Sequence, residues 1–282
     1  MQARNLLWLL VLLLAIESLV GEFYRTVPLT VLHLTILLSF AFVHGAMRYG
    51  TRGIVAFAVI CLVVSNLIEN LGVATGFPFG PYHYTDALGP KLGYVPLMIG
   101  PAYLGVGYLS WVLGGILIGD VRRQSDGWQV VATPLVGAFI MVMWDLAMDP
   151  MASTLAQWWI WHKGGGYFGV PLQNYLGWYL TVFAFMLIFA LYLRAYGPEQ
   201  TAPQPKSYYL QAIAMYAVVA LDFVASYMVK GSEHVTDATG MSWRSGDIYE
   251  TSALVALLTM MFVVVLTTLT VAREPDETCA QP

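Results

Sequence analysis

Apolar residues in this chain come in long unbroken runs, without the alternating or one-faced patterns of soluble proteins. Eight such runs are close to 20 residues long, which is enough for a helix to cross the hydrocarbon core of a bilayer. They lie at 5–21, 27–47, 53–72, 93–119, 130–149, 174–195, 208–229 and 251–272. The pattern predicts an all-α, polytopic integral membrane bundle of about eight transmembrane helices.

The runs leave little room for a second domain. We expect one membrane domain over 1–272 and a polar C-terminal tail over 273–282, with a Pro- and Gln-rich linker at 198–206. The first run follows Arg4, as in a signal peptide, but it lacks a small-residue cleavage site and continues into Glu17. We therefore predict a retained helix, with a cleaved segment as the alternative.

Composition agrees with a membrane protein. Of 282 residues, 58% are hydrophobic and 11% are charged, whereas soluble domains contain about 25% charged residues. The net charge of −4 is scattered, so no nucleic-acid partner is expected. Cys61 and Cys279 are too few for a disulfide framework or a cysteine metal site. Membrane lipids are the expected surroundings.

Lysine and arginine placement predicts the orientation. The N-terminal side of the predicted bundle carries eight of these residues and the opposite side carries five. By the positive-inside rule both termini are cytoplasmic, in a membrane we take to be a prokaryotic plasma membrane. The larger set is Arg4, Arg48, Arg52, Arg122, Arg123, Arg194, Lys206 and Arg273.

The polar residues of the predicted spans gather at one membrane face. Odd spans run away from the N-terminal side and even spans return to it, so the connections 73–92, 150–173 and 230–250 share the far side as long, re-entrant-like loops. The same parity places there Glu17, Glu22, His33, Glu69, Asn70, Asp145, Asp149, Asn174, Asp222, Asp247 and Glu250. Such convergence predicts a pocket that opens at this membrane boundary.

The segment 69–111 is expected to form one wall of that pocket. It is long and dense in glycine, proline and aromatic residues, whereas ordinary connections are short and polar. Glycine and proline permit tight turns and close approach to a ligand. The predicted substrate-binding side chains are Phe77, Phe79, Tyr82 and Tyr84 of this segment, with Trp144 and Trp178.

Three carboxyl groups are candidate acids. Asp145 and Asp149 are four residues apart and share one helical face. An ionised Asp near the centre of a membrane helix costs about 2.5–3.5 kcal/mol, so such residues are usually functional. Together with Glu69 they lie near helix C-termini, which disfavours negative charge. A neutral carboxyl is a usable proton donor. The alternatives are a boundary role for Asp149 and a structural ion pair with Arg244 or Lys163.

Other chemistries find less support. No P-loop, G-x-S-x-G or HExxH motif is present, and the five histidines lack metal-ligand spacing, so we predict no metal. The spacing of Asp145 and Asp149 also occurs in magnesium-dependent prenyl-diphosphate enzymes, but this face offers few basic residues for a diphosphate. Aromatic rings attract cations, and a protonated alkene is a carbocation. An acid among rings suits proton addition to an isoprenoid double bond, although an interfacial aromatic belt explains many of the rings equally well.

Four segments carry a resemblance to a known family. They are ENLGVATGFPFGPYHYTDALGP at 69–90, VPLMIGPAYL at 95–104, WDLAMDPMAS at 144–153 and GVPLQNYLGWYL at 169–180. In this order they resemble the signature segments of the integral-membrane carotenoid biosynthesis family, which includes CruF-type carotenoid 1,2-hydratases and bacterioruberin-pathway hydratases. The resemblance covers roughly residues 65–180. Tyr103 departs from a family pattern that often has tryptophan at this place.

The resemblance implies that water is added across a terminal double bond of an acyclic carotenoid, giving a tertiary hydroxyl without a cofactor. In the resulting hypothesis Asp145, favoured over Asp149 and Glu69, protonates the alkene. Asn70, Asn174 or an ionised acid holds the attacking water. Substrate and water are the expected partners, with other carotenoid-pathway enzymes as candidates.

Three other functions remain open from the residues. A proton-initiated carotenoid or terpene cyclase uses the same acid and rings but excludes water. A magnesium-dependent prenyl-transfer enzyme loses activity with a chelator. A carotenoid or lipid carrier leaves the mass of its ligand unchanged, and helices interrupted by proline and glycine suit it as well.

Overall fold

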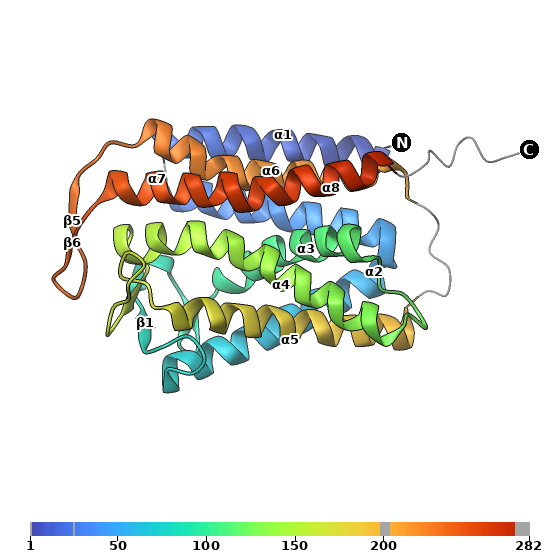
Figure 1. The fold of residues 1–282 in the computed structure, drawn as a ribbon, viewed down its shortest axis with the longest axis horizontal. Helices are drawn as coiled ribbons and strands as arrows, with labels where there is room; N and C mark the ends of the chain where they lie inside the picture. The colour runs from blue at the N-terminus through green and yellow to red at the C-terminus, as the bar shows by residue number, and fades with distance from the viewer. Residues whose placement is uncertain (1, 25, 198–203, 274–282) are drawn as a thin grey trace, which may run out of the picture.

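The computed structural model describes residues 2–24, 26–197 and 204–273, and within them it is a helical bundle (Figure 1). Seven helices in these ranges are long and apolar enough to cross a membrane. The helices are α1 (Gln2–Phe23), α2 (Val27–Thr75), α3 (Ile99–Ile118), α4 (Gly127–Asp149), α5 (Leu172–Tyr196), α6 (Lys206–Val229), α7 (Ser245–Val255) and α8 (Met261–Arg273). A π-helical turn, Ala256–Met260, joins α7 and α8 into one span.

Helix α2 contains two of the predicted spans. Its 49 residues would measure roughly 74 Å as a straight helix, more than twice the thickness of a bilayer core. Gly50 has φ 65° and ψ 173°, which a residue with a side chain rarely adopts, and it breaks the helix there. Figure 1 shows α2 running out and back, with its turn at the end of the bundle where α1 begins. The predicted polytopic all-α bundle is confirmed, with seven helices making about eight passes.

The three long connections lie together at the other end of the bundle, as the parity argument predicted (Figure 1). Strand β1 (Tyr82–Tyr84) follows α2 and pairs antiparallel with β4 (Trp159–Trp161), which follows α4 and the π-helical turn Pro150–Leu155. A short 3-10 helix, Asp86–Leu88, leads to the small β2 (Lys91–Leu92) and β3 (Val95–Pro96) pair. β5 (His234–Thr236) and β6 (Ser242–Arg244) form a hairpin before α7.

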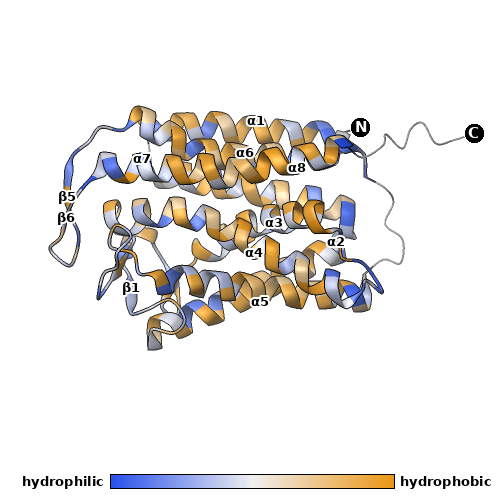
Figure 2. Cartoon of the chain, viewed as in Figure 1, coloured by the Kyte–Doolittle hydropathy of each residue, from blue (hydrophilic) through white to orange (hydrophobic). Residues whose placement is uncertain are grey.

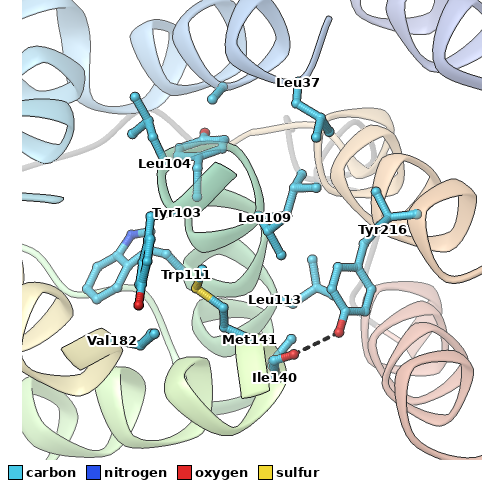
Figure 3. Packing of buried hydrophobic residues seen from close by; sticks show 14 of the residues in the cluster. Leu37, Tyr103, Leu104, Leu109, Trp111, Leu113, Ile140, Met141, Val182 and Tyr216 are labelled. Carbon is cyan, nitrogen blue, oxygen red and sulfur yellow. Dashed lines mark hydrogen bonds between the residues drawn. The ribbon is translucent and has the colours of Figure 1, made fainter. Parts of the chain in front are cut away.

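The core is built around α3, in which every residue from Tyr103 to Gly115 is buried. Figure 3 shows Tyr103, Leu109 and Trp111 of this helix packed among residues of its neighbours. Glycine allows the backbones to approach closely, since a Cβ on Gly114 would lie 3.1 Å from the backbone nitrogen of Gly137. Hydrophilic residues gather at the ends of the bundle and apolar ones along its length (Figure 2), as expected for a chain that spans a bilayer.

Some sequence predictions fall on other residues. Apart from Arg273, the predicted tail over 273–282, with Cys279, lies outside the described residues, as do residues 198–203 of the predicted linker. The single membrane domain over 1–272 stays a prediction.

Candidate functional site

A cavity of about 450 Å³ lies at the loop end of the bundle. This volume falls in the range of sites that hold a small molecule or the end of a longer one. Most of its wall is apolar or aromatic, with polar side chains on two sides. The apolar lining includes Leu29, Leu34, Ile99, Met148, Met151, Val219 and Phe223.

The first polar side is centred on Glu69, near the end of α2, which is 2% exposed and lines the cavity. Tyr82 donates a short hydrogen bond to Glu69 Oε2, and the Tyr84 hydroxyl donates to the same oxygen over 3.0 Å. Tyr103 donates to Oε1 over 2.8 Å. Burial, together with the nearby Glu69 carboxyl, raises the pKa of Tyr82 and Tyr84 well above the ordinary value. Both hydroxyls therefore keep their protons and can act as donors.

The loop after α2 delivers these tyrosines by strand geometry. Successive side chains of a strand point to opposite faces, so Tyr82 and Tyr84 point inward and His83 is exposed. Phe79 packs beneath them against two glycines. A Cβ on Gly72 or Gly177 would lie 2.5 or 2.6 Å from the Phe79 ring, so both positions need glycine.

Behind this wall lies the aspartate pair. Asp145 and Asp149 are fully buried. Asn174 Nδ2 donates to Asp145 Oδ2 over 3.2 Å and to Asp149 Oδ2 over 2.5 Å. Trp159 Nε1 donates to Asp149 Oδ1 over 2.8 Å, whereas Asp145 Oδ1 is buried and has no hydrogen-bond partner among the residues that the structure describes. Asn174 lines the cavity and the two aspartates do not.

The sequence left open an ion pair between the aspartates and Arg244, but Arg244 pairs with Asp247 instead. The guanidinium of Arg244 lies 3.6 Å from Asp247 and is more than half exposed. The aspartates are held by an amide and an indole, which are neutral donors.

Aromatic rings cover much of the cavity. Tyr103 stacks on Trp178 with ring centroids 4.2 Å apart, and Trp144 meets Trp178 edge-on at 6.0 Å. Five of the six predicted substrate-binding residues line the cavity: Phe79, Tyr82, Tyr84, Trp144 and Trp178. The sixth, Phe77, is 59% exposed and lies outside it. Trp158, Trp159 and Trp161 join the lining through the pairing of β1 with β4, which the sequence did not reveal.

Asn70 is not brought to the cavity. Its Oδ1 accepts from the backbone nitrogen of Tyr94 over 2.8 Å, and its Nδ2 donates to the Leu92 carbonyl over 3.3 Å. Nδ2 also contacts Asn66. The side chain therefore ties the loop 89–97 to the end of α2.

Replacing Asn70 with alanine is expected to lower stability more than chemistry. The backbone groups of Leu92 and Tyr94 lose their partner, which costs about 1–3 kcal/mol of unfolding free energy. Thermal unfolding in detergent measures this loss. Asn66→Ala is the matched control with a smaller effect, because only the contact with Asn70 is removed. Loss of product from a fully stable Asn70→Ala protein would instead give Asn70 the catalytic role expected from the sequence.

The second polar side faces the cavity from α1, the first half of α2 and α6. His33 Nδ1 lies 2.7 Å from Glu17 Oε2, and both residues line the cavity. Ser226 of α6 and Lys230, which directly follows that helix, also line it, and both contact Glu22. The sequence placed Glu17 and His33 at this end of the bundle but gave them no role. Among the described residues no cluster of three or more His, Cys, Asp or Glu could hold a metal ion.

Comparison with known proteins identifies the family of the chain. Residues 26–236 match the model of a family described as carotenoid biosynthesis protein. The chain is 31% identical over 179 residues to a bisanhydrobacterioruberin hydratase of Haloarcula japonica. That match covers 63% of this chain and 59% of the length of the relative. No solved structure matches the chain.

Proposed function

The chain belongs to the carotenoid biosynthesis protein family, and from this premise we propose that it hydrates a terminal double bond of an acyclic carotenoid. The observation that carries the proposal is a buried carboxyl, Glu69, held by three tyrosine hydroxyls on the wall of an aromatic cavity. The name of the similar protein supports the same reaction class. The cavity holds the reacting end, and the rest of the polyene lies among the helices and lipids.

The first step is protonation of the alkene. The acid proton of Glu69 forms a C–H bond with the less substituted alkene carbon, using the π electron pair, and leaves a tertiary cation on the neighbouring carbon. The carboxylate that forms is stabilised by hydroxyl donors already in place, which lowers the barrier in a water-poor site. Trp178, Trp144 and Phe79 present ring surfaces that favour the cation.

Access to the cavity favours Glu69 among the three candidate acids. The sequence favoured Asp145, but the cavity reaches Glu69 and Asn174 and stops short of Asp145 and Asp149. We therefore give the proton transfer to Glu69. The aspartate pair accepts hydrogen bonds from the amide nitrogen of Asn174 and so fixes the orientation of this amide at the cavity wall.

In the second step a water molecule forms a C–O bond to the cationic carbon and loses a proton, giving the tertiary alcohol. Hydration needs no electron acceptor or donor, so no redox cofactor is required. The cavity lies at a bundle end, where water reaches the membrane boundary. A cyclase would need the same acid and rings, but the second polar side of the cavity favours water capture over closure of a ring.

Expression in a bacterial host that makes lycopene tests the function. We expect a new carotenoid heavier by one water for each hydrated end, identified by mass spectrometry of the extracted pigment. A product of unchanged mass but altered spectrum would indicate a cyclase. Unchanged substrate bound to purified protein would indicate a carrier, and activity lost with a chelator would indicate prenyl transfer. The empty vector is the control.

We also place the chain in a prokaryotic plasma membrane with the N-terminal end of the bundle cytoplasmic. The Lys and Arg excess at that end supports this orientation. The reaction then takes place at the outer boundary, and an upstream enzyme must release its acyclic carotenoid into the lipid phase.

A further inference from the structure

The cavity has two polar sides on different layers of the bundle. Glu69 and Asn174 belong to the second half of α2 and to α5, whereas Glu17 and His33 belong to α1 and the first half of α2. Figure 1 shows α1 and α6 in one layer and α4 and α5 in the other. Hydration adds a proton to one alkene carbon and a hydroxyl to its neighbour, so a base on the second polar side can take the proton of the attacking water while the donor stands on the first side.

The hydrogen bond of His33 leaves one ring nitrogen for this task. Nδ1 lies 2.7 Å from Glu17 Oε2, and a carboxylate there fixes the tautomer with the proton on Nδ1. Nε2 then carries a lone pair, and within the described part of the chain it has no hydrogen-bond partner. Glu17 is 8% exposed and His33 is half-buried, so the ring is held in place yet open to the cavity.

The other polar groups of the cavity are less suited to accept a proton from water. Asp222 of α6 also lines the cavity, but an aspartate carboxylate is intrinsically a weaker base than an imidazole. Glu22, which lies behind the lining residues Ser226 and Lys230, contacts Lys230 at 3.4 Å and receives a hydrogen bond from Ser226 over 2.6 Å. The amide of Asn174 is not a base, and it lies on the side of the proton donor. An imidazole oriented by a carboxylate is a common general base near neutral pH.

We propose that His33 is the general base of the hydration step and that Glu17 is its positioning residue. The proposal rests on the hydratase function above. As the water oxygen forms the C–O bond, one water proton passes to His33 Nε2, and the imidazolium is stabilised by Glu17. The proton gained by His33 replaces, through solvent, the proton lost by Glu69, so the net reaction consumes one water.

Deuterium incorporation tests whether Glu69 donates the proton and His33 accepts the proton from water. A cation that is not captured by water returns a proton to the Glu69 carboxylate and re-forms an alkene. In D₂O the recovered substrate gains one mass unit at an end each time the cation loses a proton and keeps the deuteron that was added. Purified wild-type and variant proteins are incubated with lycopene in detergent, and the masses of substrate and alcohol are followed over time.

His33→Gln is expected to lower alcohol formation by about 10²-fold or more, the usual contribution of a general base. Deuterium entry into the recovered substrate continues at the wild-type rate or faster. His33→Gln therefore raises the ratio of exchange to hydration, and Glu17→Gln is expected to raise the same ratio by a smaller factor. General damage to the fold lowers exchange and hydration together, so the ratio separates a chemical role from a structural one.

His83→Gln is the matched control, because it is the same substitution at a histidine that is exposed on strand β1. It should leave both rates unaltered. The proposal is overturned if His33→Gln hydrates normally, or if it loses exchange and hydration together while it unfolds at the wild-type temperature. A wild-type protein that neither exchanges nor hydrates would overturn the hydratase function itself, and the role of His33 would fall with it.

Discussion

Glu69→Gln is expected to reduce the hydrated carotenoid by about 10²–10⁴-fold, the range lost when a general acid is removed. The glutamine keeps the size of the side chain, and its amide oxygen can still accept from the hydroxyls on one side of the group, either Tyr82 and Tyr84 or Tyr103. It cannot donate an acid proton to a carbon. Deuterium entry into recovered substrate should fall by the same factor, because the cation no longer forms. Pigment mass spectrometry with purified protein in D₂O measures both quantities.

Asp145→Asn is the comparison for this experiment. Asp145 does not line the cavity, so we expect a smaller loss than for Glu69→Gln, with both variants folded. The reverse order of effects would contradict proton donation by Glu69. It would return the role to Asp145, whose buried Oδ1 has no hydrogen-bond partner in the described part of the chain.

Tyr103→Phe is expected to lower the hydration rate by about 10²–10³-fold, the usual cost of losing one preorganised donor to a developing negative charge. The hydroxyl that donates to Glu69 Oε1 is removed, while the phenyl ring still stacks on Trp178. Thermal unfolding in detergent shows whether the packing survives. Single-turnover rates with lycopene, read from product mass, give the chemical effect.

Tyr108→Phe is the matched control on the same helix. The Tyr108 hydroxyl contacts His44 at 2.6 Å, away from the cavity, so hydration should proceed at the wild-type rate. Equal rates for Tyr103→Phe and wild type would show that the hydroxyl donors do not stabilise the Glu69 carboxylate during proton transfer.

The membrane-crossing segments were predictable from the sequence. The end of the bundle at which the site lies was predictable as well. Long apolar runs are a strong signal in a bilayer, and parity then assigns each polar residue to one end of the bundle or the other without knowledge of packing. Glu69, Asp145, Asp149 and Asn174 do meet at that end.

Which side chain faces the cavity was not predictable. Consecutive residues of a helix point about 100° apart, so Glu69 reaches the cavity while Asn70 turns to the loop. Apolar residues cover nearly all faces of these helices, and no polar stripe reports their rotation. The same limit explains why the sequence favoured Asp145 as proton donor although it does not line the cavity, and why Phe77 was placed with Phe79.

The pair of Glu17 with His33 was missed for a different reason. Both residues were located at the correct end, but their contact depends on how α1 packs on α2, and spacing in the sequence carries no such information. A histidine and a glutamate sixteen positions apart resemble no motif. The signal was only that both are polar residues inside apolar runs.

The turn at Gly50 connects the two helical arms that carry residues of the two polar sides of the cavity. His33 and Glu69 lie on the two arms of one helical hairpin, and Gly50 is its apex at the opposite end of the bundle. The gap between the proposed proton donor and the proposed proton acceptor therefore depends on the opening angle of that hairpin. A small change of angle at the apex becomes a much larger displacement at the tips. The fit of an end group between His33 and Glu69 is thus governed in part by a residue that never meets it.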